Sequence, residues 1–476
     1  VVAGFKVFGE SVFAAKLLMV LSAAMIIALS YTLARALGVD RTRALISAAV
    51  VGGHKIFFST SNQHIPDMPL VLGVSVALLG FVHILNREKP PVWVYYAAWF
   101  GVAFAVSAKG MLVLLLVALY LPFRLFGARS LRVNLHEFLA IVGAVVLAGS
   151  WFAYIALSYP EAFMAQFVGD QVASKAGFDP AQVLAGVLKT SSDLVLAGLP
   201  MVVAVALAFL FARGSAHVRI GISRAAVFLI AWCAVTVLVF AFSTQLYERY
   251  ILPALPAFGA LLAFLSMKVS IEALSRGLRW AMWVFLPLPA FVALASIVLL
   301  VKFGSIGLAL AVVAGALLVV LALYALGRRS PYLMGLLGTS MVMPLIAVAI
   351  LPLHFAFLFP TAGQQIAQLG WGASDKIVLL DNPKLADDIG LQIGGITRFH
   401  YRRSLELERD GDAAHVVFLD AKHLPMLEAA GYRVERRYFL RSLDVAWPDI
   451  TQAWHLGDPR AFMARKGELL YIAHSG

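Results

Sequence analysis

Cysteine and charged residues are both scarce in this sequence. The single cysteine, Cys233, lies inside an apolar run, which excludes a disulfide framework and any zinc site built from several thiolates. Charged residues occupy 13% of the 476 positions, and apolar residues occupy 61%. Soluble domains have roughly a quarter of their residues charged and about half apolar. The composition therefore excludes an ordinary soluble protein and indicates a protein that crosses a membrane many times.

Long apolar runs fill the first 360 residues. A helix needs roughly 20 apolar residues to cross a bilayer, and such runs predict about 12 spanning helices here. Lys109 and Gly110 interrupt one long run, which we interpret as two short helices that meet there. We expect an all-α polytopic membrane domain over residues 1–360. The predicted spans are Val12–Leu37, Arg43–Phe58, Met68–Leu85, Val92–Ser107, Met111–Phe126, Phe138–Ser158, Leu194–Phe211, Ala225–Phe242, Ile251–Met267, Trp280–Val301, Ile306–Leu326 and Leu333–Phe359.

The net charge of +12 is distributed unevenly between the two sides of these spans. Alternate connections hold about 16 cations on one side and about five on the other, and the positive-inside rule makes the richer side cytoplasmic. The basic excess is thus a topological signal and predicts no nucleic-acid partner. The cytoplasmic set is Arg35, Arg41, Arg43, Arg87, Lys89, Arg124, Arg129, Arg132, Arg213, Arg219, Arg224, Lys268, Arg276, Arg279, Arg328 and Arg329.

This topology gives the first predicted span an outside-to-inside direction. The sequence begins VVAGFKVFGE, without a methionine or a signal peptide. Because an inward-running first span usually needs a preceding signal, we expect at least one helix upstream of residue 1. The alternative is an odd number of spans with an exported N-terminus. Whether a helix precedes residue 1 or the N-terminus is exported, we expect a multi-pass inner-membrane protein whose C-terminal part is periplasmic.

Residues 361–476 have a different character, with more charge and no long apolar run. KIVLLD (Lys376–Asp381) and HVVFLD (His415–Asp420) are typical of short strands, and each precedes a helix-like stretch that ends at Gly390 or Gly431. YRVERRYFLRS and GELLYIAHS are further strand candidates. We therefore expect a small soluble α/β domain over residues 361–476, to which no chemistry is assigned.

Several polar side chains converge on the predicted outer face. His64 and Asp67 stand where a span begins, and Asp67 is a candidate catalytic residue, a cation ligand or a plain helix cap. Lys109 lies between two apolar helices without an acid near it in sequence. Its ammonium group either binds an anion such as phosphate or extends toward the interface.

A second outer segment, Ser243–Phe258, carries Glu248, Arg249 and Tyr250 at the mouth of a span. Arg249 is suited to bidentate phosphate binding, or it pairs with Glu248 at the interface. The long connection Tyr159–Asp193 alternates polar and apolar residues, as in helices that lie on a membrane surface, or in a plain connector. The remaining histidines are scattered, so no protein metal site is predicted, and no cofactor is assigned; a divalent cation remains compatible with the sequence.

Four segments in order resemble the GT-C superfamily of polyprenyl-phosphate-sugar glycosyltransferases. The nearest branch contains the lipid A aminoarabinose transferase and the protein O-mannosyltransferases. The segments, which cover roughly the first 270 residues, are FGESVFAAKLLMVLSAAMIIALSYTLARALG, SNQHIPDMPLVLGVSVALLGF, GVAFAVSAKGMLVLLLVALYLPF and FSTQLYERYILPALPAFGALLAF. Each is weak alone because it is mostly apolar, and the order is what carries the resemblance.

The resemblance implies transfer of a sugar from a polyprenyl-phosphate donor to a lipid, glycan or protein acceptor at the periplasmic face. Lys109 and Arg249 would then face the phosphate, with His64, Glu248 and Tyr250 nearby, and Asp67 would lie near the acceptor or an associated metal. The family's leading catalytic acid belongs to a first outer loop that precedes the matching segment, and this sequence begins after that point. The alternatives are a lipid or glycan transporter and a non-catalytic envelope assembly protein. Effective catalysis requires Asp67, Lys109 and Arg249 to lie within about 20 Å of one another.

Overall fold

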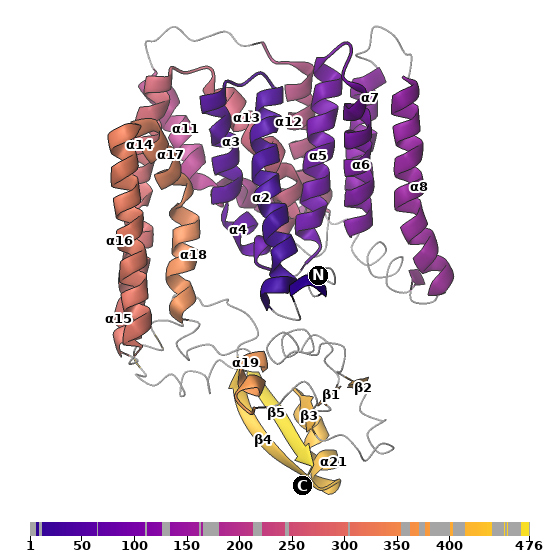
Figure 1. Ribbon diagram of the computed structural model, residues 1–476, viewed down its shortest axis with the longest axis vertical. Coiled ribbons are helices and arrows are strands. Elements are labelled where there is room, and N and C mark those ends of the chain that lie inside the picture. Colours follow the sequence, from indigo (N-terminus) through magenta and orange to yellow (C-terminus); the bar gives the residue numbers. More distant parts are fainter. Residues whose placement is uncertain are drawn as a thin grey trace. The chain divides into compact units, whose positions relative to one another are not determined.

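The protein is a bundle of helices followed by a small sheet, as a computed structural model shows (Figure 1). It describes residues 6–8, 12–63, 65–109, 112–125, 134–160, 163–164, 180–212, 221–242, 247–302, 305–353, 362–370, 377–380, 400–402, 415–439, 452, 455 and 468–475. The chain divides into two compact units, of which the larger comprises Met19–Pro289 and Val320–Leu345. The smaller comprises Val1–Leu18, Ala290–Val319 and Ile346–Gly476.

The helical elements follow the apolar runs of the sequence. They are α2 (Val12–Ala36), α3 (Arg41–Gly53), α4 (Lys55–Ser61), α5 (Asp67–Asn86), α6 (Val92–Lys109), α7 (Leu112–Leu125), α8 (Leu135–Ser158), α10 (Pro180–Leu196), α11 (Leu199–Phe211), α12 (Arg224–Ala241), the 3₁₀ helix η2 (Glu248–Ala254), α13 (Leu255–Ser266), α14 (Ile271–Phe285), α15 (Pro287–Lys302), α16 (Ile306–Arg329), α17 (Pro331–Ser340) and α18 (Val342–Leu353).

The predicted all-α polytopic domain is confirmed. Among the described residues, eight helices are long and apolar enough to cross a membrane, and ten crossings result if each of two bent helix pairs is one span. The two remaining predicted runs form shorter helices: one is α7, and the other is broken at His54 into α3 and α4. The chain is therefore a multi-pass membrane protein.

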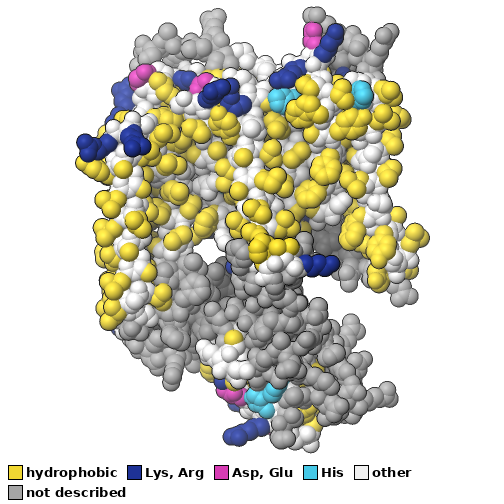
Figure 2. Space-filling model, viewed as in Figure 1, with side chains coloured by type: hydrophobic (Ala, Val, Ile, Leu, Met, Phe, Trp, Pro, Cys, Tyr) yellow, Lys and Arg dark blue, Asp and Glu magenta, His cyan; other side chains and the backbone are white. Residues whose placement is uncertain are grey.

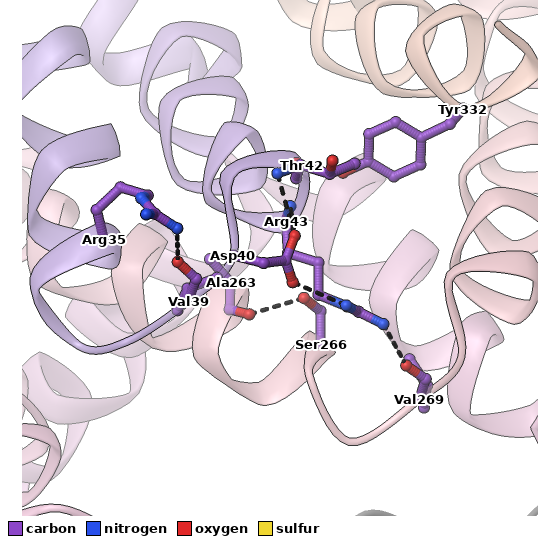
Figure 3. Close-up of polar contacts among 9 residues, drawn as sticks. All are labelled: Arg35, Val39, Asp40, Thr42, Arg43, Ala263, Ser266, Val269 and Tyr332. Atoms are coloured by element: carbon purple, nitrogen blue, oxygen red, sulfur yellow. Dashed lines mark hydrogen bonds and ion pairs between the residues drawn. The ribbon is translucent and has the colours of Figure 1, made fainter.

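Basic side chains gather at one end of the helices of the larger unit, where Lys and Arg appear dark blue in Figure 2. Asp40 caps the start of α3 there: its Oδ1 accepts hydrogen bonds from the backbone N–H groups of Thr42 and Arg43, both at 3.0 Å (Figure 3). Arg43 donates to Asp40 Oδ2 at 2.7 Å and to the carbonyl of Val269 at 2.9 Å. Partial burial opposes ionisation, but the bonds from Arg43 and Thr42 hold the pKa of Asp40 below its usual value.

A buried ion pair joins α7 to α8 near the same end. Arg124 donates to Glu137 Oε2 through Nε at 3.1 Å and through Nη2 at 3.0 Å, and Tyr120 donates to Glu137 Oε1 at 2.7 Å. The Glu137 side chain is only 4% exposed. These bonds satisfy a carboxylate that would otherwise be costly in apolar surroundings, because a buried charge without a partner loses its hydration uncompensated.

Glu137→Gln should therefore lower the free energy of unfolding by about 3 kcal/mol, because it leaves the Arg124 charge buried without a counter-ion. Unfolding in mixed detergent micelles measures the loss. Lys189→Ala is the matched control, since Lys189 forms a more exposed pair with Asp193 within α10 and should cost less than about 0.5 kcal/mol. Equal losses in the two variants would contradict the structural role of Glu137.

The C-terminal sheet belongs to the smaller unit. Its strands are β1 (Ile377–Leu380), β2 (His400–Arg402), β3 (His415–Phe418), β4 (Tyr432–Phe439) and β5 (Glu468–Ser475), in the order β2-β1-β3-β5-β4. β1 pairs in parallel with β2 and β3, whereas β5 runs antiparallel to β3 and β4. The remaining elements are α19 (Ala362–Ala367), the 3₁₀ helix η6 (Ala421–His423) and α21 (Leu424–Ala429).

The predicted α/β character of this region is confirmed, and the four predicted strands appear as β1, β3, β4 and β5. Apolar side chains cover both faces of the sheet; Ile366 packs on one face and Leu427 on the other. The helix expected before Gly431 is α21, and Gly431 adopts a positive φ of 84° there. The stretch expected before Gly390 lies outside the described residues. The three-residue strand β2 was not predicted, because it is too short to show an alternating pattern.

Candidate active site

The antiparallel pair α5 and α6 brings Asp67 and Lys109 together. Asp67 is the first residue of α5 and Lys109 is the last residue of α6, so the two residues occupy the same end of the pair. Gly73 lets the helices approach closely, because a Cβ atom at this position would lie 2.7 Å from the carbonyl oxygen of Gly101. Small residues at such contacts are the usual means of close helix packing in membranes.

Asp67 lies between two cations. Lys109 Nζ donates to Asp67 Oδ1 at 2.5 Å, and Arg249 Nε lies 3.7 Å from Asp67 Oδ2. The side chain of Asp67 is 5% exposed, whereas those of Lys109 and Arg249 are 31% and 33% exposed. We call these three residues the ion triad. Its net charge is +1, so a nearly buried carboxylate is compensated and one positive charge remains accessible from outside.

Arg249 reaches the triad from η2, which packs against α12. The indole Nε1 of Trp232 in α12 donates to the carbonyl of Pro253 at 3.0 Å. Pro253 lacks a backbone N–H and cannot take part as a donor in a regular helix ladder, which fits the 3₁₀ form of this turn. Within the described residues Arg249 Nε is buried and has no hydrogen-bond partner. The guanidinium is thus attracted to Asp67 and keeps unused donor capacity.

The two cations of the triad each lie over the ring of a tyrosine. Arg249 Cζ lies 4.6 Å from the ring centroid of Tyr247, and Lys109 Nζ lies 5.5 Å from that of Tyr250. Tyr250 in turn stacks on Phe240, with centroids 4.5 Å apart and planes 18° apart. A cation over an aromatic face is attracted by the ring quadrupole, and these contacts orient the two side chains.

Sequence reasoning missed Tyr247. The signal was the YERY spacing, since residues three apart lie on the same side of a 3₁₀ helix. Glu248, the local alternative partner of Arg249, is 3.8 Å from Lys55 Nζ instead. That pair is exposed, with side chains 62% and 54% accessible, and contributes little stability. His64 lies outside the described residues.

The donor set around Asp67 does not resemble a metal site. In the described part of the chain, no group of three or more His, Cys, Asp or Glu side chains is arranged to hold a metal ion. The charged groups at the Asp67 carboxylate are instead an ammonium and a guanidinium, which are anion-binding groups. The residues described here therefore fit an anion.

Comparison with known proteins bears on the fold that carries these residues. The family described as dolichyl-phosphate-mannose-protein mannosyltransferase matches residues 2–153. An uncharacterized protein of Aquifex aeolicus (strain VF5) is 23% identical over 170 residues, which are 36% of this chain and 34% of that protein. The aligned part thus spans about a third of that relative.

The whole chain resembles ArnT from Cupriavidus metallidurans. Its crystal structure bound to undecaprenyl phosphate superimposes with a TM-score of 0.67 at 17% identity, over 99% of this chain and 86% of that one. The apo structure gives 0.66 at 16% identity, with the same coverage. These superpositions show the fold: this chain is a multi-pass membrane protein built like ArnT.

Proposed function

We propose that this protein is a membrane glycosyltransferase that takes a sugar from a polyprenyl-phosphate donor at the periplasmic face of the inner membrane. The observation that carries the proposal is the ion triad: a nearly buried carboxylate held by two half-buried cations at one end of the helices. The match to a mannosyltransferase family over residues 2–153 and the ArnT-like fold support it.

In this proposal Lys109 and Arg249 bind the donor phosphate. Both are accessible from outside, and a guanidinium beside an ammonium is suited to phosphate oxygens. Their attraction strengthens as the bond between the sugar carbon and the phosphate oxygen breaks, because negative charge then builds on the leaving phosphate. Stabilisation of that kind favours the transition state over the ground state.

Asp67 then accepts the proton of the acceptor hydroxyl as its oxygen bonds to the sugar carbon. The charges balance at both stages. A phosphodiester donor has one negative charge and neutralises the triad, whose net charge is +1. After transfer Asp67 is neutral, so the two cations face a phosphate monoester of about two negative charges. The acceptor is a lipid A, glycan or protein hydroxyl group.

The compartment follows from the charge distribution of the connections. The basic end of the helices would be cytoplasmic. The opposite end, where α5 begins and α6 ends and where the triad lies, would then be periplasmic. By the same rule, residues 361–476 would form a periplasmic domain that follows a membrane domain of residues 1–360. A transporter is less well supported, since the triad lies at helix ends, whereas transporter sites lie near the bilayer midplane.

The purified protein should bind undecaprenyl phosphate and should not bind undecaprenol, which lacks the phosphate. Arg249→Ala should weaken binding roughly 100-fold, the value of a charge-assisted hydrogen bond of about 3 kcal/mol, and Arg249→Lys should recover part of it. Binding to protein in nanodiscs, followed with radiolabelled lipid, measures both. Equal affinity for undecaprenol and undecaprenyl phosphate would refute the proposed function. So would movement of the lipid across the membrane of proteoliposomes without any transfer of sugar.

A further inference from the structure

Two helices of the larger unit are broken, and the breaks contact each other. α3 ends at Gly53 and α4 begins at Lys55, with His54 extended between them at φ −74° and ψ 123°. α10 and α11 meet at an angle of 76° between Leu196 and Leu199. Breaks of this kind leave backbone carbonyls without helical partners, which is costly where water is excluded. We call residues 53–55 and 194–199 the His54 junction.

The two breaks are joined by hydrogen bonds, in which residues at one break donate to backbone carbonyls at the other. His54 Nε2 lies 3.4 Å from the carbonyl oxygen of Leu194, and the backbone N–H of Lys55 donates to the carbonyl of Ala197 at 3.3 Å. Because a carbonyl oxygen only accepts, this hydrogen bond requires the proton on Nε2. The His54 residue is fully buried, with 0% exposure. A Cβ atom on Gly198 would lie 3.3 Å from His54 Cδ2, so the imidazole fills the space at the bend.

The helices that meet at the His54 junction contact η2, the element that carries Arg249. Both α4 and α10 pack against η2. Lys55, the residue after His54, also pairs with Glu248, the residue before Arg249. η2 is therefore supported by two elements that are joined to each other through the His54 imidazole. Movement of α4 or α10 would shift Arg249 relative to Asp67. Arg249 Nε lies 3.7 Å from Asp67 Oδ2, so a small shift is enough to break this ion pair.

We propose that His54 is a positioning residue: by joining the two broken helices it holds η2, and with it Arg249, where the donor phosphate binds. The proposal rests on the proposed function for its consequence in binding, and on the contacts of the junction for its structural part. His54 touches neither Asp67 nor Lys109 in any described contact, so it acts through η2.

Hydrogen exchange of the η2 amides tests the structural part without any ligand. His54→Leu keeps a side chain of similar size but removes the N–H donor, and exchange over residues 248–254 should become roughly tenfold faster, the value of one lost hydrogen bond. Gly198→Ala should have a similar effect, because its Cβ atom would lie only 3.3 Å from Cδ2 of the imidazole and would displace the ring. His54→Gln retains an N–H donor and should stay close to wild type. Gly149→Ala is the control, because a Cβ atom there meets nothing within 4 Å.

Binding of undecaprenyl phosphate tests the link to Arg249. His54→Leu should weaken binding roughly tenfold in the wild-type background and less than about twofold in the Arg249→Ala background, since residues that act through one another are not additive. His54→Gln should restore the wild-type affinity. A residue that only stabilises the fold would weaken binding equally in both backgrounds.

Unchanged exchange of residues 248–254 in both His54→Leu and Gly198→Ala would overturn the proposal, and so would an equal loss of lipid binding with and without Arg249. Failure of the proposed function looks different. In that case the wild-type protein binds no undecaprenyl phosphate, and Arg249→Ala changes nothing, while the exchange data still decide whether His54 holds η2.

Discussion

Asp67→Asn should reduce sugar transfer about 1,000-fold, as expected for loss of a general base. The same variant should bind undecaprenyl phosphate more tightly than the wild-type protein. The amide keeps the size of the side chain but removes its negative charge, so the triad goes from a net charge of +1 to +2. A phosphate anion then replaces the lost carboxylate as the counter-ion of Lys109 and Arg249, and the two effects have opposite signs.

Two measurements check this prediction. Release of undecaprenyl phosphate from undecaprenyl-phosphate sugars reports transfer, and the rise of the unfolding temperature with added undecaprenyl phosphate reports binding. Glu272→Gln is the matched control, because Glu272 is also an acid in the first turn of a helix, in α14, and should behave as wild type. If Asp67→Asn transfers sugar at the wild-type rate, Asp67 is not the base. If it loses binding together with transfer, the carboxylate is needed to hold the cations in place.

Lys109→Ala should have the second largest effect, on transfer and on stability together. Transfer should fall roughly 100-fold, because one of two groups that stabilise the leaving phosphate is missing. The free energy of unfolding should fall by about 1–3 kcal/mol, since Asp67 remains nearly buried without its nearest counter-ion. The upper limit for a fully buried pair is not expected, because the Lys109 side chain is 31% exposed.

The double variant Asp67→Ala with Lys109→Ala separates the two effects. Removing both partners leaves no uncompensated carboxylate, so most of the stability should return, whereas transfer should stay at the level of the weaker single variant. Unfolding in mixed micelles measures the stability, and sugar-transfer rates on the same preparations measure the activity. A single variant as stable as the wild type would show that the Asp67–Lys109 pair does not matter for the fold. A single variant with normal transfer would remove Lys109 from the phosphate site.

Apolar runs were sufficient to predict the membrane helices. The run lengths correspond to the helices because a bilayer imposes a minimum length, and strands β1 and β3 were visible as short apolar runs in a polar region. Both signals are local, and each is repeated along many residues. Breaks within helices were harder to predict. Gly52 and Gly53 weaken a helix just before His54, but the partner carbonyls of the break belong to residues 194 and 197.

The sequence alone therefore determined the class of the protein, and it predicted the direction of its helices and the side chains of the ion triad. Lys109 illustrates the limit. No acid is near it in the chain, and it was expected either to bind an anion or to extend toward the interface; its partner Asp67 is 42 residues away. Only the tertiary structure decided that pairing, along with the choice of Asp67 over Glu248 beside Arg249. Hydrophobic spacing acts along the chain, whereas an ion pair depends on which helix ends meet in space, here through the close packing of α5 on α6.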